Sequence, residues 1–301
     1  MHLARLKLRD FRNIRRLDVA FEPGFHVLLG RNAQGKTNLL EAVYLLATLR
    51  SFRGVGNAQI IRHERKAFFA GGLAIGQAEN DIRYYWSAAQ RKLTVNEKPI
   101  RRVADYLGAL RTVIFCTEDS LLVNGPAKSR RRFLDLLLTQ TRPGYLDLLH
   151  RYTEALRSRN ALLKRDSPDL ALLDSFTCEL VATGEKLIVA RRQLVKKLSP
   201  LIRLGYRKIA AKPEDARIDY APSVREDFAV DLAKSRGREQ RYRTTLIGPH
   251  RDELKLTLDG QPAAQYASEG QKRTFAIALK MAQADYLGGI HGSPPILLID
   301  D

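Results

Sequence analysis

The sequence predicts an α/β protein in which a core, made of a mixed sheet with a β-subdomain, is joined to a compact helical lobe. Three observations predict this class. The letters GRNAQGKT at 30–37 stand between an apolar run and a helical pattern, and this is the setting of a phosphate-binding loop. Short strand patterns follow from 67 to 100, and a Leu-, Arg- and Lys-rich helical region follows later. We therefore expect three segments, namely a core segment at 1–128, a basic helical lobe at 129–243 and a return to the core at 244–301.

The composition is that of a folded and strongly basic protein. The chain has 301 residues, 45% of them hydrophobic, and 51 basic against 33 acidic residues give a net charge of +18. This excess favours a polyanionic partner such as nucleic acid, although a basic surface without such a ligand remains the alternative. The two cysteines, Cys116 and Cys178, indicate neither a disulfide framework nor a zinc site. Because no signal peptide or membrane-spanning run is visible, we expect a cytoplasmic protein.

The N-terminal segment is predicted to form strands that lead into the loop. Apolar residues at 4, 6 and 8 alternate with charged ones, which is the period of a half-buried strand. A second short strand is expected at 17–21, and Pro23-Gly24 ends it. The apolar run from Phe25 to Leu29 then predicts the strand that enters the phosphate loop.

The loop itself carries the clearest chemistry. Gly30 and Gly35 let successive backbone N–H groups turn toward phosphate oxygens, and the helix that follows adds the positive end of its dipole. Lys36 would reach the β and γ phosphates, and the Thr37 hydroxyl would ligate Mg²⁺. A glycine-containing turn that matches by chance is the alternative. The candidate nucleotide-binding residues here are Gly30, Arg31, Asn32, Ala33, Gln34, Gly35, Lys36, Thr37 and Asn38.

A helix after Thr37 should lie against a sheet, because its apolar residues recur at helical spacing. Strands are expected at 70–75, 81–87 and 93–95, followed by a buried parallel strand at 110–116. Glu118 and Asp119 come directly after that strand. They either lie at the sheet edge where ligands bind or simply cap the next helix.

The helical region is interrupted by Pro143, Pro168, Pro200 and Pro213 and sustains no heptad. It therefore predicts a compact lobe rather than a long coiled coil. Basic side chains cluster on its helices, where they either track a phosphate backbone or form a solvated helical face. The candidate DNA contacts are Arg130, Arg131, Arg132, Arg191, Arg192, Lys196 and Lys197.

Two further segments return the chain to the core. GPHRD at 248–252 precedes an alternating strand and the hairpin signal Asp259-Gly260. Ser268 and Gln271 then form a capping box for a helix that should stop before Gly288. Capping alone explains that pair, but Gly270 leaves the helix N-terminus open enough for an anion, so this is a second candidate anion site.

The last segment, ILLIDD at 296–301, predicts a buried strand that ends in two carboxylates. With the phosphate loop present, Asp300 is expected to hold the Mg²⁺ that Thr37 ligates. Asp301 is expected to orient or deprotonate the attacking water.

Together these residues resemble those of the RecF family, bacterial recombinational-repair ATPases. The resemblance extends over essentially the whole chain, and GPHRD with SEGQKR is more specific than the phosphate loop. It implies an ABC-type ATPase fold related to the structural-maintenance-of-chromosomes proteins, with a short helical lobe in place of their coiled coil. The motifs that carry it are FRNI at 11–14, GRNAQGKTN at 30–38, EDSLLVNGPAKSRRRFLD at 118–135, GPHRDEL at 248–254, SEGQKR at 268–273 and ILLIDD at 296–301.

The resemblance also implies a mechanism. ATP would be held between two copies, one supplying 30–37 with Asp300 and the other supplying Ser268, Gly270 and Gln271, while Glu118 senses the γ-phosphate and Mg²⁺. The family binds DNA at single-strand/double-strand junctions of gaps and acts with RecR and RecO to load RecA. ATP binding sets the clamp, and slow, DNA-stimulated hydrolysis resets it.

The family continues beyond the position of Asp301, so we expect a C-terminally truncated chain with impaired hydrolysis. Three other functions compete with the DNA clamp. One is an ABC-type ATPase subunit that energises a membrane transporter. The others are a phosphate-loop kinase or small-molecule transferase, and a purely structural DNA-binding protein.

Overall fold

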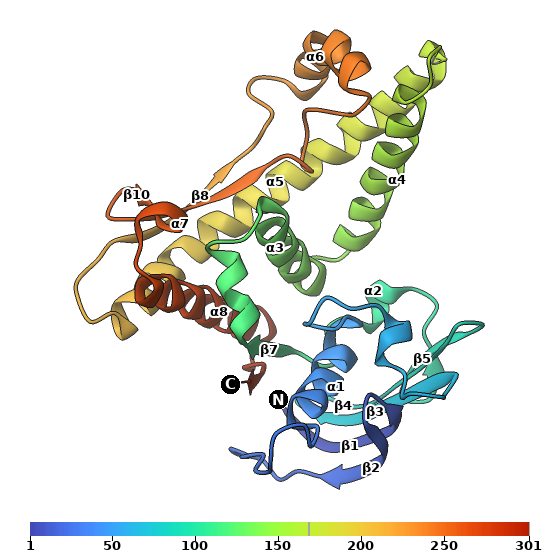
Figure 1. Ribbon diagram of the computed structural model, residues 1–301, viewed down its shortest axis with the longest axis vertical. Helices are drawn as coiled ribbons and strands as arrows, with labels where there is room; N and C mark the ends of the chain where they lie inside the picture. The colour runs from blue at the N-terminus through green and yellow to red at the C-terminus, as the bar shows by residue number, and fades with distance from the viewer. Residues whose placement is uncertain (168, 301) are drawn as a thin grey trace. The chain divides into compact units, whose positions relative to one another are not determined.

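The computed structural model describes residues 1–167 and 169–300, which form two compact units. Figure 1 traces their helices and strands along the chain. The first unit comprises Met1–Asp119 and the segment from Leu279 onward, and the second comprises Ser120–Ala278. The predicted limits at 128 and 243 differ from this division. The second limit falls later than predicted because the strand at 253–258, expected in the core, pairs with the strand at 216–221 of the helical region. The predicted break at Pro168 lies outside the described residues.

An antiparallel sheet of six strands, in the order β2-β1-β3-β4-β5-β6, forms much of the first unit. Along β1, Leu6 and Leu8 are buried while Arg5 and Lys7 are exposed, which confirms the alternation in the sequence. All five strands predicted up to residue 95, apart from the run at 25–29, are present. The strands are β1 (His2–Phe11), β2 (Ile14–Ala20), β3 (Ala67–Ile75), β4 (Glu79–Ser87), β5 (Arg91–Val95) and β6 (Lys98–Pro99).

Helix α1 (Lys36–Thr48) covers this sheet and buries Leu45 and Leu46 in its core. Each such leucine contributes about 2 kcal/mol through removal of apolar surface from water. The Tyr106 hydroxyl donates to the Leu46 carbonyl oxygen at 2.6 Å and ties the helix to the short α2. The predicted helix and its position against a sheet are therefore confirmed. Shorter turns accompany it, namely η1 (Asn57–Ile60), α2 (Val103–Tyr106) and η2 (Thr117–Leu122).

Two strands that are far apart in the sequence pair in parallel beside α1. β7 (Thr112–Phe115) and β11 (Ile296–Ile299) run in register from Thr112 opposite Ile296 to Phe115 opposite Ile299. Val113 and Ile114 are buried, as the continuous apolar run predicts. This pairing brings the end of the described chain to the neighbourhood of α1.

The predicted strand at Phe25–Leu29 is wrong. This segment has no regular structure, and Phe25 and Leu29 are 85% and 89% exposed. A strand needs a neighbour for its backbone N–H and C=O groups, and no strand of the described residues pairs with this segment. Apolar pattern alone does not supply that neighbour.

The second unit combines helices with a three-stranded sheet in the order β10-β9-β8. Helices α4 and α5 pack along each other, and β8 packs against α5 (Figure 1). The predicted hairpin at Asp259-Gly260 is confirmed, whereas β8 lies in a region predicted to be helical. The elements are α3 (Ala127–Thr141), α4 (Tyr145–Leu163), α5 (Leu170–Ile209), β8 (Ala216–Ala221), α6 (Phe228–Tyr242), β9 (Glu253–Leu258), β10 (Gln261–Pro262), α7 (Ala263–Tyr266) and the start of α8 (Glu269–His291).

Two helices are longer than predicted. α5 runs for 40 residues with Pro200 inside it, so the break expected at Pro200 is wrong. A proline removes one helical hydrogen bond, but the buried residues on either side, such as Leu198 and Ile202, keep the helix packed. α8 likewise continues past Gly288 to His291. None of the described helices is both long and apolar enough to cross a membrane.

Candidate nucleotide-binding site

The loop from Gly30 to Gln34 is exposed and leads into α1 through Gly35. Gly35 has a φ of 100°, in the left-handed region. A Cβ at this position would also lie 2.8 Å from Asn13 Oδ1. Both features require glycine. The first N–H groups of α1 lack helical acceptors and are therefore available to an anion held by the loop.

Lys36 lies over this loop. Its Nζ donates to the Gly30 carbonyl oxygen at 2.7 Å and to the Arg31 carbonyl oxygen at 3.1 Å. The ammonium is therefore held above the loop backbone by two carbonyl groups, which carry no net charge that would neutralise it. An anion cradled by the loop N–H groups would meet this charge directly.

Thr37 and Asp300 meet, as the sequence predicts. The Thr37 hydroxyl donates to Asp300 Oδ1 at 2.8 Å, although the two residues are 263 positions apart. The parallel strand pair positions Asp300, whose N–H donates to the Phe115 carbonyl oxygen at 2.9 Å. A hydroxyl and a carboxylate are hard oxygen ligands, the kind that Mg²⁺ prefers.

These two oxygens fit the protein's share of a Mg²⁺ site whose other ligands are phosphate and water. Within residues 1–167 and 169–300, no group of three or more His, Cys, Asp or Glu side chains could hold a metal. Asp301, predicted to act on the attacking water, lies outside the described residues.

A buried ion pair links α1 to the turn between β1 and β2, and the sequence motifs predict no role for it. Glu41 is fully buried and accepts two hydrogen bonds from Arg12, at 2.9 and 2.7 Å. The Ser51 hydroxyl donates to the same carboxylate, and Arg53 lies 3.7 Å away. The available signal was a glutamate on the apolar face of the predicted helix, four residues after Thr37.

Asn13, next to Arg12, holds the loop itself. Its Nδ2 donates to the Ala33 carbonyl oxygen at 3.2 Å, and its Oδ1 accepts from Asn38 Nδ2 at 2.8 Å. Asn38 in turn accepts from Arg53 at 3.0 Å. Asn13 therefore connects the loop to the first turn of α1.

Of the two carboxylates after β7, Asp119 has a structural role. Its Oδ2 accepts from the Cys116 N–H at 3.0 Å, and its Oδ1 lies 3.1 Å from Lys280 Nζ. Asp119 therefore caps its own turn, which was the alternative in the sequence. Glu118 is exposed, and its carboxylate accepts a long hydrogen bond, 3.4 Å, from the Thr117 hydroxyl. Its sensing role stays a prediction.

The capping box at the start of α8 is present. The Ser268 N–H donates to Gln271 Oε1 at 2.6 Å, and the Gln271 N–H donates to Ser268 Oγ at 3.3 Å. Gly270 is open, since a Cβ at this position would have Ser268 Oγ as its nearest neighbour, 3.9 Å away. Gln271 Nε2 also donates to Glu214 at 2.6 Å, and the Tyr206 hydroxyl donates to the other Glu214 oxygen at 2.6 Å. These residues link α8 to the end of α5.

The GPHRD segment is a structural clasp within the second unit. Asp252 is fully buried and accepts from the Tyr220 hydroxyl and from the Ser223 N–H. Arg191 forms two hydrogen bonds at 2.9 Å to Asp135 and a third at 2.7 Å to the Pro249 carbonyl oxygen. Burial works to lower the pKa of Arg191, but the Asp135 carboxylate outweighs it and the pKa is raised.

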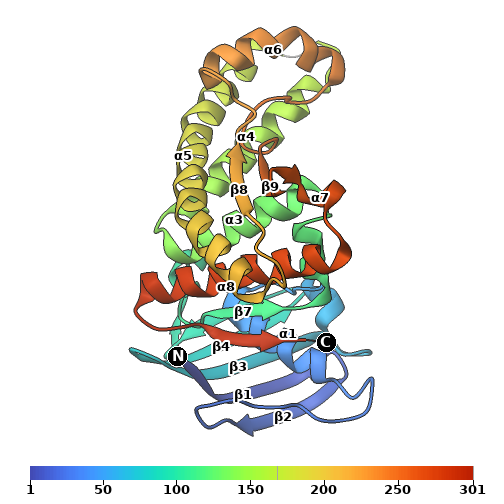
Figure 2. The same ribbon diagram turned by 90° about the vertical axis from the view of Figure 1, so that its left-hand side faces the viewer.

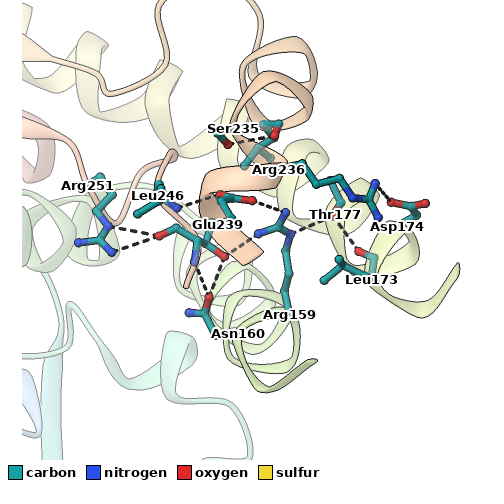
Figure 3. Close-up of polar contacts among 12 residues, drawn as sticks. Arg159, Asn160, Leu173, Asp174, Thr177, Ser235, Arg236, Glu239, Leu246 and Arg251 are labelled. Carbon is teal, nitrogen blue, oxygen red and sulfur yellow. Dashed lines mark hydrogen bonds and ion pairs between the residues drawn. The ribbon is translucent and has the colours of Figure 1, made fainter. Parts of the chain in front are cut away.

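A second buried network lies beside the clasp (Figure 3). Arg159 is 2% exposed and donates to Glu239 at 2.6 Å, to Thr245 at 2.8 Å and to Thr177 at 2.9 Å. Asn160 accepts from the Thr245 N–H at 2.8 Å. These bonds join α4, α5 and α6 to the segment that enters GPHRD.

His250 is predicted to make the second unit sensitive to acid. Its Nε2–H donates to the Thr245 carbonyl oxygen at 3.1 Å, and its Nδ1 accepts from the Tyr152 hydroxyl at 2.6 Å. Burial lowers the His250 pKa to about 4 from 6.5, and Arg251, Arg131 and Arg159 act in the same direction. Between these values the unfolded chain binds the proton and the folded chain does not, so stability falls as pH decreases. The loss from pH 7 to 4 should reach about 3 kcal/mol.

Urea unfolding from pH 7 to 4 measures this loss. The His250→Gln variant should show a shallower dependence than the wild type, whereas His63→Gln, whose side chain is 93% exposed, should follow the wild type. Parallel wild-type and His250→Gln curves would contradict the assignment.

The structure divides the seven candidate DNA contacts. Arg191 is 3% exposed and Arg130 is 12% exposed in a two-bond pair with Glu253, so the structure removes both from the candidates. Arg131 is half-buried, donates to the Asp252 carbonyl oxygen at 2.6 Å and has a pKa lowered by burial, so it is removed as well. A charge that is satisfied inside the fold is not available to a phosphate backbone. The exposed candidates are Arg132, Arg192, Lys196 and Lys197.

Comparison with curated proteins and protein families gives consistent matches. The family model described as the RecF/RecN/SMC N terminal domain matches residues 2–301. The DNA replication and repair protein RecF of Symbiobacterium thermophilum is 38% identical over 316 residues, covering all of this chain and 84% of that protein. Its counterpart from Geobacter metallireducens is 36% identical and is covered to 85%.

Solved structures agree with these matches. The structure described as the recombination mediator protein RecF-ATP in the RecFOR pathway has a TM-score of 0.93 and 30% identity, covering 99% of this chain and 84% of that one. An Smc head domain from Pyrococcus furiosus, at 13% identity and a TM-score of 0.52, shares the fold alone. The predicted ABC-type α/β fold class is thereby confirmed, and the chain belongs to the RecF family of DNA replication and repair proteins.

Proposed function

We propose that this protein is an ATP-switched DNA clamp of recombinational repair, in which two copies close on ATP. The observation that carries the proposal is the 2.8 Å contact between Thr37 Oγ1 and Asp300 Oδ1 at the first turn of α1. It joins the phosphate loop to the carboxylate at the end of β11, which is the pairing that a Mg²⁺-nucleotide site needs. The solved relatives described as RecF-ATP and RecF-ATPrS support the choice of nucleotide.

The residues of one copy would bind the triphosphate. Gly35 and the first N–H groups of α1 cradle phosphate oxygens, and Lys36 exchanges its two carbonyl acceptors for them. Bound Mg²⁺ would neutralise phosphate charge between Thr37 and Asp300. Asn13 and the Arg12–Glu41 pair keep the loop in this shape.

The second copy would supply the start of its α8. An open Gly270 lets a γ-phosphate approach the helix N-terminus, and Ser268 and Gln271 offer hydroxyl and amide groups there. ATP is then the ligand that closes the dimer, and its loss reopens the clamp. Asp301 is proposed to orient or deprotonate the attacking water, and Glu118 to sense the γ-phosphate and Mg²⁺.

DNA binding is supported by the net charge of +18 and by the exposed basic side chains of the second unit. Arg132, Arg192, Lys196 and Lys197 are the proposed phosphate contacts. We propose gapped DNA with its single-strand/double-strand junctions as the substrate, and RecR and RecO as partners in loading RecA, in line with the RecFOR description of the solved relatives. DNA would stimulate slow ATP hydrolysis. The relatives described above are DNA replication and repair proteins, which argues against a transporter subunit.

The Gly270→Asp variant tests the two-copy site. A side chain at this position meets open space, so the fold should be unchanged, while the added carboxylate repels phosphate at the helix N-terminus. We expect each copy to bind Mg²⁺-ATP with an affinity near that of the wild type, but ATP should no longer dimerise the protein in sedimentation velocity. Gapped-DNA affinity should lose its dependence on ATP.

Gly289→Asp is the matched control, because it makes the same change on α8 where a side chain also meets open space. It should dimerise like the wild type. The two-copy site would be refuted if Gly270→Asp dimerised with ATP at the same protein and ATP concentrations as the wild type. Wild-type protein that stays monomeric with saturating ATP would refute the clamp.

A further inference from the structure

Helix α6 lies at one end of the second unit, where α4 ends and α5 begins (Figure 2). Two ion pairs hold it there. Arg243, directly after the helix, lies 2.9 Å from Asp166, and Arg236 lies 2.6 Å from Asp174 in the second turn of α5. The helix is therefore fixed to the ends of its two neighbours.

The two sides of α6 differ in burial and in charge. Both acidic residues of the helix, Asp231 and Glu239, are buried, and Glu239 accepts from Arg159 at 2.6 Å (Figure 3). The opposite side is exposed, and its residues follow helical spacing. We call this side the α6 face. It consists of Lys234, Gly237, Arg238, Arg241 and Tyr242.

The α6 face carries three cations, and two of them are unpaired. Lys234 lies 3.3 Å from Glu226, in an exposed pair that water and salt screen. Arg238 and Arg241 make no hydrogen bond or ion pair within residues 1–167 and 169–300. Their guanidinium groups are therefore available to an anionic ligand.

These arginines are a separate group from the exposed cations of α5. Asp174 marks where α6 is attached to α5, and Arg192 lies 18 residues further along that helix. At 1.5 Å per residue this separation is about 27 Å, which duplex DNA covers in about eight base pairs. One phosphate cannot contact both groups.

Gly237 and Tyr242 add two further features to the α6 face. Glycine inside a helix costs stability relative to alanine, and a Cβ at Gly237 would meet nothing within 4 Å, so packing does not require glycine here. Its small size lets the backbone of a ligand approach the helix. Tyr242 is 62% exposed and follows Arg238 by one helical turn, so the two are neighbours on the surface.

We propose that the α6 face binds the single-strand/double-strand junction of gapped DNA. Arg238 and Arg241 contact phosphates, and Tyr242 stacks on the first unpaired base. This inference rests on the proposed DNA clamp and adds the residues that tell a junction from a plain duplex.

The chemistry of the α6 face matches a nucleic-acid strand. Each nucleotide offers a phosphate and a flat base, and the face offers cations beside an exposed aromatic ring. The first unpaired base at a junction has one side free for stacking, whereas a base inside a duplex is covered on both sides. Tyr242 therefore responds to the junction, and the two arginines respond to any DNA.

Stacking is measured with 2-aminopurine at the first unpaired position on each side of a gap. Fluorescence at one of these positions should fall when wild-type protein or Tyr242→Phe binds, but not when Tyr242→Leu binds. Tyr242→Leu should also bind gapped DNA at least about fivefold more weakly and plain duplex as tightly as the wild type. Because the side chain is exposed, urea unfolding should be unchanged.

The phosphate contacts are measured by the dependence of affinity on salt. Arg241→Gln should weaken binding to gapped and duplex DNA by a similar factor and reduce the salt slope by about 1. Gly237→Glu, whose side chain enters open space, should weaken both as well. Arg101→Gln removes one exposed charge from the first unit and is the matched control, which should bind like the wild type.

The outcomes separate this inference from the clamp. Wild-type protein that binds no gapped DNA would overturn both. Normal gapped-DNA binding by the wild type, by Tyr242→Leu and by Arg241→Gln would leave the clamp standing and overturn this inference alone, and the α6 face would then suit an acidic protein partner. Equal loss of gapped and duplex binding in Tyr242→Leu would overturn the recognition of a junction.

Discussion

Replacing Glu41 with glutamine is expected to lower the free energy of unfolding of the first unit by about 3 kcal/mol, the lower end of the range for breaking a buried ion pair. The Glu41 carboxylate is fully buried and receives two of the three side-chain hydrogen bonds of Arg12, whose side chain is only 18% exposed. The amide removes the charge but leaves the guanidinium partly buried. Because Arg12 precedes the residue that holds the loop, Mg²⁺-ATP affinity should also fall about tenfold or more.

Urea unfolding and calorimetric titration with Mg²⁺-ATP measure the two effects. Glu79→Gln makes the same chemical change at an exposed position of β4 and should alter neither quantity. The double variant Arg12→Leu/Glu41→Leu should regain part of the stability, because the guanidinium of Arg12 is no longer left without its carboxylate. A Glu41→Gln protein as stable as the wild type would show that the pair does not brace α1.

Replacing Arg191 with methionine is expected to cost the second unit about 4 kcal/mol. The substitution removes the three hydrogen bonds of a 3% exposed guanidinium, and it leaves Asp135 and the Pro249 carbonyl oxygen without that donor in the clasp. Arg192→Met, one residue further along α5, should change stability by less than about 0.5 kcal/mol because its side chain is exposed.

DNA affinity should respond in the opposite way to stability, falling in Arg192→Met and not in Arg191→Met. At a temperature where both proteins are folded, Arg191→Met should bind gapped DNA like the wild type, while Arg192→Met should bind it more weakly and with a smaller dependence on salt. An Arg191→Met protein of normal stability and reduced DNA affinity would contradict the conclusion that buried Arg191 is structural and exposed Arg192 contacts DNA.

The features that the sequence predicted well are those set by local pattern. The loop into α1 depends on the glycines and on helical spacing, and the capping box depends on two residues three apart. The meeting of Thr37 with Asp300 followed from placing two motifs at the ends of buried strands, although the two residues lie far apart in the chain.

The features it missed depend on neighbours that a pattern does not name. Phe25–Leu29 has the apolar pattern of a strand, but a segment becomes a strand only by pairing with another one, and this segment has no regular structure. Pro200 is a residue that usually ends a helix, yet the buried residues on both sides of it keep α5 continuous. Arg191 and Arg192 look identical in a charge run, and only the fold decides that one is buried and the other exposed.

The carboxylate of Glu214 has two donors, Gln271 at the start of α8 and Tyr206 in the last turns of α5, both at 2.6 Å. A ligand that binds the Gln271 amide breaks its hydrogen bond to Glu214 and leaves Glu214 with one donor fewer. A change at the end of α5 therefore alters the free-energy cost of breaking that hydrogen bond. The two helix ends therefore share one free-energy term, and such a term acts with equal strength in both directions. Glu214 would make events at the start of α8 and along α5 reciprocally dependent.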